Sequence, residues 1–126
     1  MKLSLKYSLL GCGALALLSL VQWVRPLSAT ATTWVRQLLG VLPNVTAAIA
    51  IPFVLLSIWA ELRPAATPAD NRRRFALCSL VAGVGLVAWE FLQLHSGRLV
   101  FDPQDIVATL VGLVLARGLF SWVTPR

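Results

Sequence analysis

The side chains best suited to chemistry lie between residues 89 and 105. This segment holds the only histidine of the chain, three of its five carboxylates, an arginine and two glutamines; the candidates are Glu90, Gln93, His95, Arg98, Asp102 and Asp105. They fall at the end of one long apolar run and the start of the next. Carboxylates in such runs are costly and usually face a bundle interior or a polar cavity. The segment is therefore the first candidate for a functional site.

The chemistry itself stays open. A carboxylate near His95 and Arg98 is able to support acid–base catalysis, but no nucleophile–base pair, phosphate loop or zinc-ligand spacing accompanies it. Cys12 and Cys78 have no metal-ligand neighbours at useful spacing, so we expect them to be packing residues. We expect no cofactor and no metal, and the sequence does not decide whether the chain is an enzyme.

The elements that position these residues are four apolar blocks. They span residues 7–24, 38–60, 75–94 and 106–123, each close to the ~20 residues that cross a bilayer as a helix. Hydrophobic residues make up 58% of the 126-residue chain and charged residues 13%, too few to solvate a soluble domain. The sequence predicts an all-α, integral membrane bundle of four transmembrane helices, forming one domain over residues 1–126.

The basic residues are distributed unevenly between the two ends of the predicted bundle. Eight of the eleven fall on one side: Lys2, Lys6, Arg63, Arg72, Arg73, Arg74, Arg117 and Arg126. The positive-inside rule then predicts cytoplasmic termini in a multi-pass protein of the inner (plasma) membrane. We expect the run 72–74 to orient the chain and to meet anionic lipid headgroups. It should contribute nothing to a site, and no nucleic acid is expected as a partner.

The third and fourth predicted helices each carry a stripe of small and polar residues. The stripes are Ser79, Gly83, Leu86, Glu90 and Gln93, and Asp105, Thr109, Gly112 and Ala116. Because a short turn joins these helices, we expect the two stripes to pack together. Segments 25–36 and 63–74 are predicted loops, and Pro43 and Pro52 predict a bent second helix.

The segment around Arg98 also suggests local interactions. Asp102 suits an N-cap, Pro103 the first helical turn and Asp105 the third position, where its charge favours the helix dipole. We expect His95 to cap the preceding helix. We also predict an interaction between Glu90 and Arg98, supported by Gln93 and Asp105.

These motifs resemble the VanZ-like membrane family, named after a teicoplanin-resistance protein. The pattern Glu90-x-x-Gln93, then Arg98-x-x-Phe101-Asp102-x-x-Asp105, then Gly112 carries the resemblance, which covers about residues 38–116. Pro43-Asn44 and Pro52 in the second block add to it. Thr109 stands where the family usually has Asn. The resemblance implies a polar site of Glu90, Gln93, Arg98, Asp102 and Asp105, with Asn44 and Thr109 beside it.

Three functions compete at this stage. The resemblance implies action at the outer leaflet on a lipid-linked envelope component, with an effect on glycopeptide-type antibiotic sensitivity in bacteria. The partners would then be membrane lipids and lipid-linked envelope precursors. Alternatively, the chain is a small structural or assembly subunit whose polar residues only hold helices together. A transport subunit with Glu90 lining a pore is the third and weakest interpretation.

Overall fold

Four long helices account for most of the protein. The computed structural model describes residues 1–97 and 101–125, with helices α1 (Leu3–Val24), α2 (Thr33–Leu62), α3 (Pro68–Gln93) and α4 (Pro103–Val123). A short 3-10 turn, η1 (Arg25–Ser28), follows α1. All four long helices have the length and apolar composition needed to cross a membrane. The predicted all-α bundle of four such helices is confirmed.

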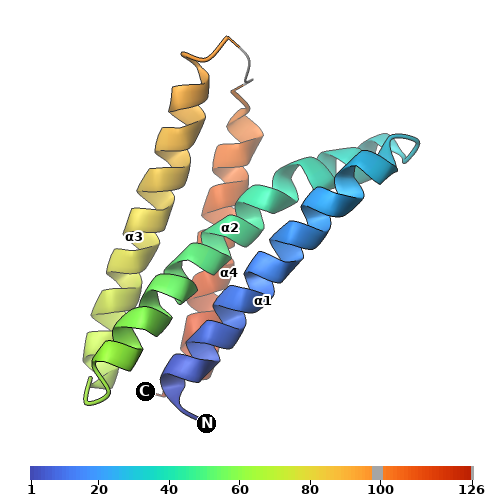
Figure 1. Ribbon diagram of the computed structural model, residues 1–126. Helices are drawn as coiled ribbons and strands as arrows, with labels where there is room; N and C mark the ends of the chain where they lie inside the picture. Colours follow the sequence, from blue (N-terminus) through green and yellow to red (C-terminus); the bar gives the residue numbers. More distant parts are fainter. Residues whose placement is uncertain (98–100, 126) are drawn as a thin grey trace.

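The helices form two arms that meet at one end. Both termini and the α2–α3 loop lie together at that end, which we call the terminal end (Figure 1). At the other end, the loop end, α1 and the first half of α2 pack side by side and lean away from α3 and α4 (Figure 1). The arrangement agrees with the predicted topology, in which the termini share one side. Which side of a membrane that is stays a prediction.

The third helix begins seven residues before its apolar block. The prediction of a loop over segment 63–74 is wrong for residues 68–74, which form the first two turns of α3. Thr67 is the N-cap: its hydroxyl accepts a hydrogen bond from the Asp70 backbone N–H, while the Asp70 carboxylate accepts one from the Thr67 backbone N–H. This capping box, with Pro68 at the first helical position, starts the helix among polar residues.

The predicted loop at residues 25–36 is also shorter than expected. Residues 25–28 form η1 and α2 begins at Thr33, so irregular backbone is limited to the few residues between them. Helix α2 continues through Pro43 and Pro52 as one helix and curves across the bundle (Figure 1). A proline removes one backbone donor and pushes the preceding turn away, which bends a helix without ending it.

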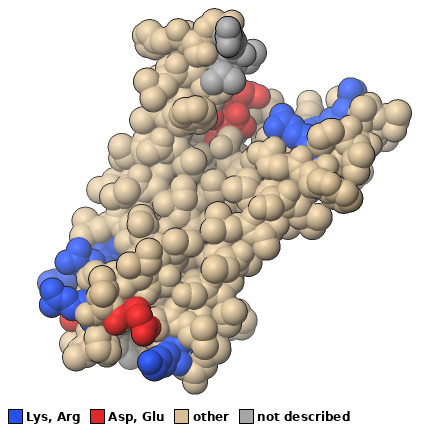
Figure 2. All heavy atoms as spheres, in the orientation of Figure 1, with Lys and Arg blue, Asp and Glu red and all other residues tan. Residues whose placement is uncertain are grey.

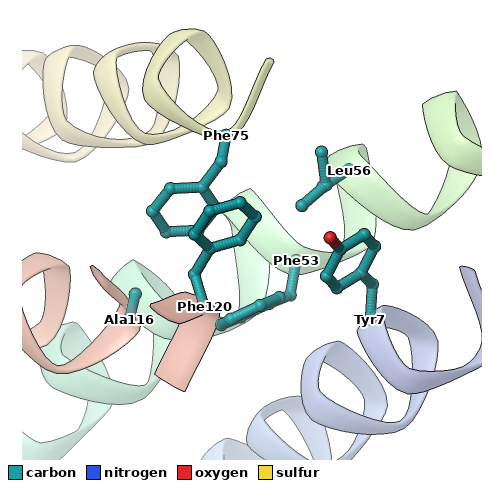
Figure 3. Close-up of a cluster of buried hydrophobic side chains, with 6 residues drawn as sticks. All are labelled: Tyr7, Phe53, Leu56, Phe75, Ala116 and Phe120. Carbon is teal, nitrogen blue, oxygen red and sulfur yellow. The ribbon is translucent and has the colours of Figure 1, made fainter. Parts of the chain in front are cut away.

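The core lies near the terminal end and draws on all four helices. Tyr7, Phe53, Phe75 and Phe120 form an aromatic cluster together with Leu56 and Ala116 (Figure 3). The Phe75 and Phe120 rings stack with centroids 4.3 Å apart. The Tyr7 hydroxyl lies 2.9 Å from the Thr124 hydroxyl, so its polar atom is satisfied inside the cluster. The cluster joins the two arms at this end.

The small residues of α4 pack against α2. A Cβ atom on Gly112 would lie 2.5 Å from the Val45 carbonyl oxygen and 2.7 Å from the Ala48 Cβ, so only glycine allows this approach. The expected pairing of the α3 and α4 stripes is therefore wrong for Gly112. Gly83 does face α4, where a Cβ atom added to this glycine would lie 3.0 Å from Leu113. The period of a stripe identifies a contact face but not the helix that will cover it.

Candidate functional site

Glu90 is the most deeply buried carboxylate of the described residues. It lies one turn before the end of α3 and is only 3% exposed. The Gln93 side chain and the backbone N–H of Asp102 lie within interaction distance of its carboxylate. Its Oε2 atom is buried and has no hydrogen-bond partner among residues 1–97 and 101–125. Since a carboxylate has about four acceptor positions, Glu90 retains capacity to accept hydrogen bonds from a ligand.

Two more carboxylates begin α4 beside Glu90. Asp102 is the N-cap, and its Oδ1 accepts a hydrogen bond of 2.9 Å from the Gln104 backbone N–H. Asp105 lies in the first turn of α4, near enough for its charge to act on Glu90. The predicted helix start, with Asp102 as cap and Asp105 in the first turn, is confirmed. Its consequence for the site is that the α4 start brings both a backbone donor and two carboxylates to Glu90.

The remaining candidates lie below this group, toward the middle of the bundle. Thr109 is buried, and its hydroxyl donates to the Asp105 backbone carbonyl at 2.9 Å, which leaves no hydroxyl proton for a ligand. Asn44 is half-buried on α2. It precedes Val45, whose carbonyl meets Gly112, and so lies beside the α4 turn that follows Thr109. The structure therefore brings Asn44 and Thr109 to one level of the α2–α4 contact.

Two predicted interactions of the turn have different outcomes. Nδ1 of His95 lies 3.4 Å from the Phe91 carbonyl oxygen, in the position expected of a residue that caps the end of α3. Arg98 falls outside the described residues, so the predicted Glu90–Arg98 interaction stays a prediction. Sequence reasoning missed the Asp102 backbone N–H as a neighbour of Glu90, because hydrogen-bond donors of the main chain leave no trace in residue type.

At the loop end a notch lies between the two arms. Figure 2 shows acidic atoms at the base of this notch, at the loop end, and basic atoms on the neighbouring α1–α2 arm. The acidic residues of this end are Glu90, Asp102 and Asp105, and the described basic residues are Arg25 and Arg36. Among the described residues, no three His, Cys, Asp or Glu side chains converge as they would around a metal ion. The arrangement suits a ligand with several spaced hydrogen-bond donors.

Comparisons with known proteins identify no relative of this chain. No protein-family model, no curated protein and no solved structure matches this chain.

Proposed function

We propose that this chain is a VanZ-like membrane protein whose notch binds the polar part of a lipid-linked component of the bacterial envelope. Binding there would lower sensitivity to glycopeptide-type antibiotics. The observation that carries the proposal is Glu90, a buried carboxylate whose Oε2 has no hydrogen-bond partner among residues 1–97 and 101–125, close to the two carboxylates that begin α4. Burying a carboxylate oxygen without a hydrogen-bond partner costs free energy, and ionisable groups buried in this way in membrane segments usually belong to functional sites.

Three features of the site define the class of ligand. The carboxylates of Glu90, Asp102 and Asp105 accept hydrogen bonds and favour positive charge. Hydroxyl groups of a sugar or an amino group are the matching donors. The notch opens at the end of membrane-length helices, where the polar head of a lipid-linked molecule lies. With the termini cytoplasmic, as the basic residues predict, this end faces the outer leaflet.

The alternative is a structural or assembly subunit. It is favoured by the internal use of two of the polar groups: Asp102 caps α4, and Thr109 bonds to the carbonyl of Asp105. In this alternative Glu90 only fastens α3 to the start of α4. The two functions predict different effects of removing the Glu90 charge. A binding site would lose its activity while the protein stays folded, whereas a structural contact would lose activity only in proportion to lost protein.

A complementation experiment separates them. A strain lacking the protein receives the wild type, Glu90→Gln or the control Glu61→Gln, and its sensitivity to glycopeptide-type antibiotics is measured alongside the abundance of each protein. Glu61 lies at the terminal end, bonded to Ser4 at 2.7 Å, so its substitution removes the same charge away from the notch. We expect Glu90→Gln to abolish complementation at normal abundance while Glu61→Gln complements. Full complementation by abundant Glu90→Gln would reject the binding function, and loss of activity in proportion to lost protein would support the structural one.

A further inference from the structure

A second site lies at the terminal end, in a groove between the end of α2 and the start of α3. We call it the α2–α3 groove; it has a volume of about 640 Å³, and its walls include Trp59, Leu62, Arg63, Arg73, Arg74 and Leu77. This volume lies within the ~300–1,000 Å³ that is typical of small-molecule sites. Three arginines and three large apolar side chains thus share one groove.

The positive charge of the groove is available to a ligand. Asp70 is the acidic residue of its wall. Its Oδ2 already accepts hydrogen bonds from the Thr67 backbone N–H at 3.0 Å and from the Thr67 hydroxyl at 2.7 Å. Over the described part of the chain the one ion pair joins Lys2 and Glu61, so none of the three arginines is paired. Their guanidinium groups keep donors in the planar geometry that binds phosphate oxygens in pairs.

One arginine is held in position by an aromatic ring. The guanidinium carbon of Arg74 lies 5.4 Å from the centroid of the Trp59 ring, a cation–π contact. The contact restricts a side chain that would otherwise sample many rotamers, which lowers the entropy lost when a ligand binds. Tryptophan also prefers the boundary between hydrocarbon and headgroups. The groove therefore lies at the depth of lipid phosphates.

The apolar wall distinguishes a lipid from a free phosphate. Leu62 is 74% exposed and Leu77 is 51% exposed, and both lie beside the arginines. The exposed apolar surface continues along α3 through Leu80, Val81 and Val84. A phospholipid fits a basic groove that continues into an apolar surface, with its phosphate among the arginines and an acyl chain along α3. A soluble phosphate would leave the apolar part uncovered.

A neighbouring hollow offers a place for the rest of the headgroup. It shares Arg63 with the α2–α3 groove and is also lined by Lys2, Glu61 and Asn71. Asn71 is 5% exposed, and its Oδ1 has no hydrogen-bond partner within the described residues. This oxygen accepts a hydrogen bond from a hydroxyl group, as found on a glycerol headgroup. We propose that the α2–α3 groove binds phosphatidylglycerol or a similar anionic phospholipid, with its phosphate held by Arg63, Arg73 and Arg74.

The assignment gives the arginines of the α3 start different roles. Arg73 and Arg74 line the α2–α3 groove and Arg72 does not; Arg72 lines another hollow, beside Arg117, which Arg73 also borders. The expectation that residues 72–74 orient the chain, meet anionic lipid headgroups and contribute nothing to a site treats the three as equivalent. Arg72 therefore supplies a matched control, because its removal changes the net charge equally. The proposal is independent of the notch at the loop end.

The test measures lipid binding to the purified full chain. Protein in mild detergent is titrated with phosphatidylglycerol or phosphatidylethanolamine and observed by native mass spectrometry. The variants are R63Q/R73Q/R74Q and the control R25Q/R36Q/R72Q, which loses three charges elsewhere. We expect the groove variant to lose phosphatidylglycerol affinity at least about tenfold, since it removes several charge-assisted hydrogen bonds. The control should stay within about twofold of the wild type.

Three results would overturn the proposal. Equal losses in both triple variants would mean that net charge alone attracts the lipid. Equal affinity of the wild type for phosphatidylethanolamine would remove the selectivity for an anionic headgroup. Displacement of the lipid by millimolar glycerol phosphate would make the groove a site for soluble phosphates. Should the groove triple variant unfold, as followed by circular dichroism, R73Q and R74Q are compared singly with R72Q under the same criteria.

Discussion

The contact between Gly112 and α2 makes a quantitative prediction about stability. In Gly112→Ala the new methyl group meets the Val45 carbonyl oxygen at 2.5 Å, whereas ordinary contact begins at 3.4 Å. Helices α2 and α4 must therefore separate locally by about 0.9 Å. A gap of ~0.5–1 Å forfeits a quarter to a half of the dispersion energy of each atom pair that it opens. Because the obstructing atom belongs to the backbone, no side-chain rotation relieves the contact.

A control on the same helix isolates this effect. A Cβ atom added to Gly118 would have no atom within 4 Å, so Gly118→Ala adds only the helix propensity of alanine, worth up to ~1 kcal/mol. Gly112→Ala gains the same propensity but carries an overpacking cost of ~1–3 kcal/mol. The difference between the two variants is therefore the overpacking cost alone, about 1–3 kcal/mol in the free energy of unfolding.

Thermal unfolding in detergent, followed by circular dichroism, measures this difference. At about 4 °C for each kcal/mol in a chain of this size, the Tm of Gly112→Ala should lie about 4–12 °C below that of Gly118→Ala. Equal Tm values would refute the close contact between α2 and α4. The result also bears on the notch, because the same contact sets the position of the α4 turn below Asp105.

Two further predictions concern the cap and the topology. Asp102→Ala should lower the free energy of unfolding by ~1 kcal/mol because the α4 N-cap is lost, whereas Asp102→Asn should keep the cap; a stable Asp102→Asn that fails to complement would show that the notch needs the carboxylate itself. In a chain without Cys12 and Cys78, single cysteines at Thr30 and Ser96 should react with an impermeant thiol reagent in intact cells, and a cysteine at Thr67 should not. Labelling of the cysteine at position 67, with no labelling at position 96, would show that the protein has the opposite orientation in the membrane.

Much of the fold follows from hydropathy, because each of the four apolar blocks lies almost entirely within one of the four helices. The start of α4 is also predictable, since Asp102, Pro103 and Asp105 each have a positional preference at helix starts. The early start of α3 carries a comparable signal in Thr67, Pro68 and Asp70. An apolar block does not reveal it, because the first two turns of that helix are polar and only the cap marks where they begin.

The partner of each helix face is not predictable in the same way. Gly112 belongs to a stripe that α2 or α3 could equally have covered, and the choice depends on how the curved α2 crosses α4. The two candidate sites differ in this respect. Glu90, Gln93 and the two aspartates are close in sequence, so their proximity is expected. The α2–α3 groove is not, since Trp59 and Arg74 are brought together only by the loop between two helices.

Because the aromatic cluster joins the two arms near the terminal end, a small change in the angle between them there produces a larger displacement at the loop end. Tyr7, Phe53, Phe75 and Phe120 fix all four helices near the terminal end, whereas the loop end holds them mainly in pairs. Glu90 lies fifteen residues beyond Phe75 on α3, which at ~1.5 Å per residue is about 22 Å of helix. A rotation of about 5° at the cluster therefore moves Glu90 by about 2 Å. The width of the notch therefore depends on the packing of this distant cluster as well as on the contact between Gly112 and α2.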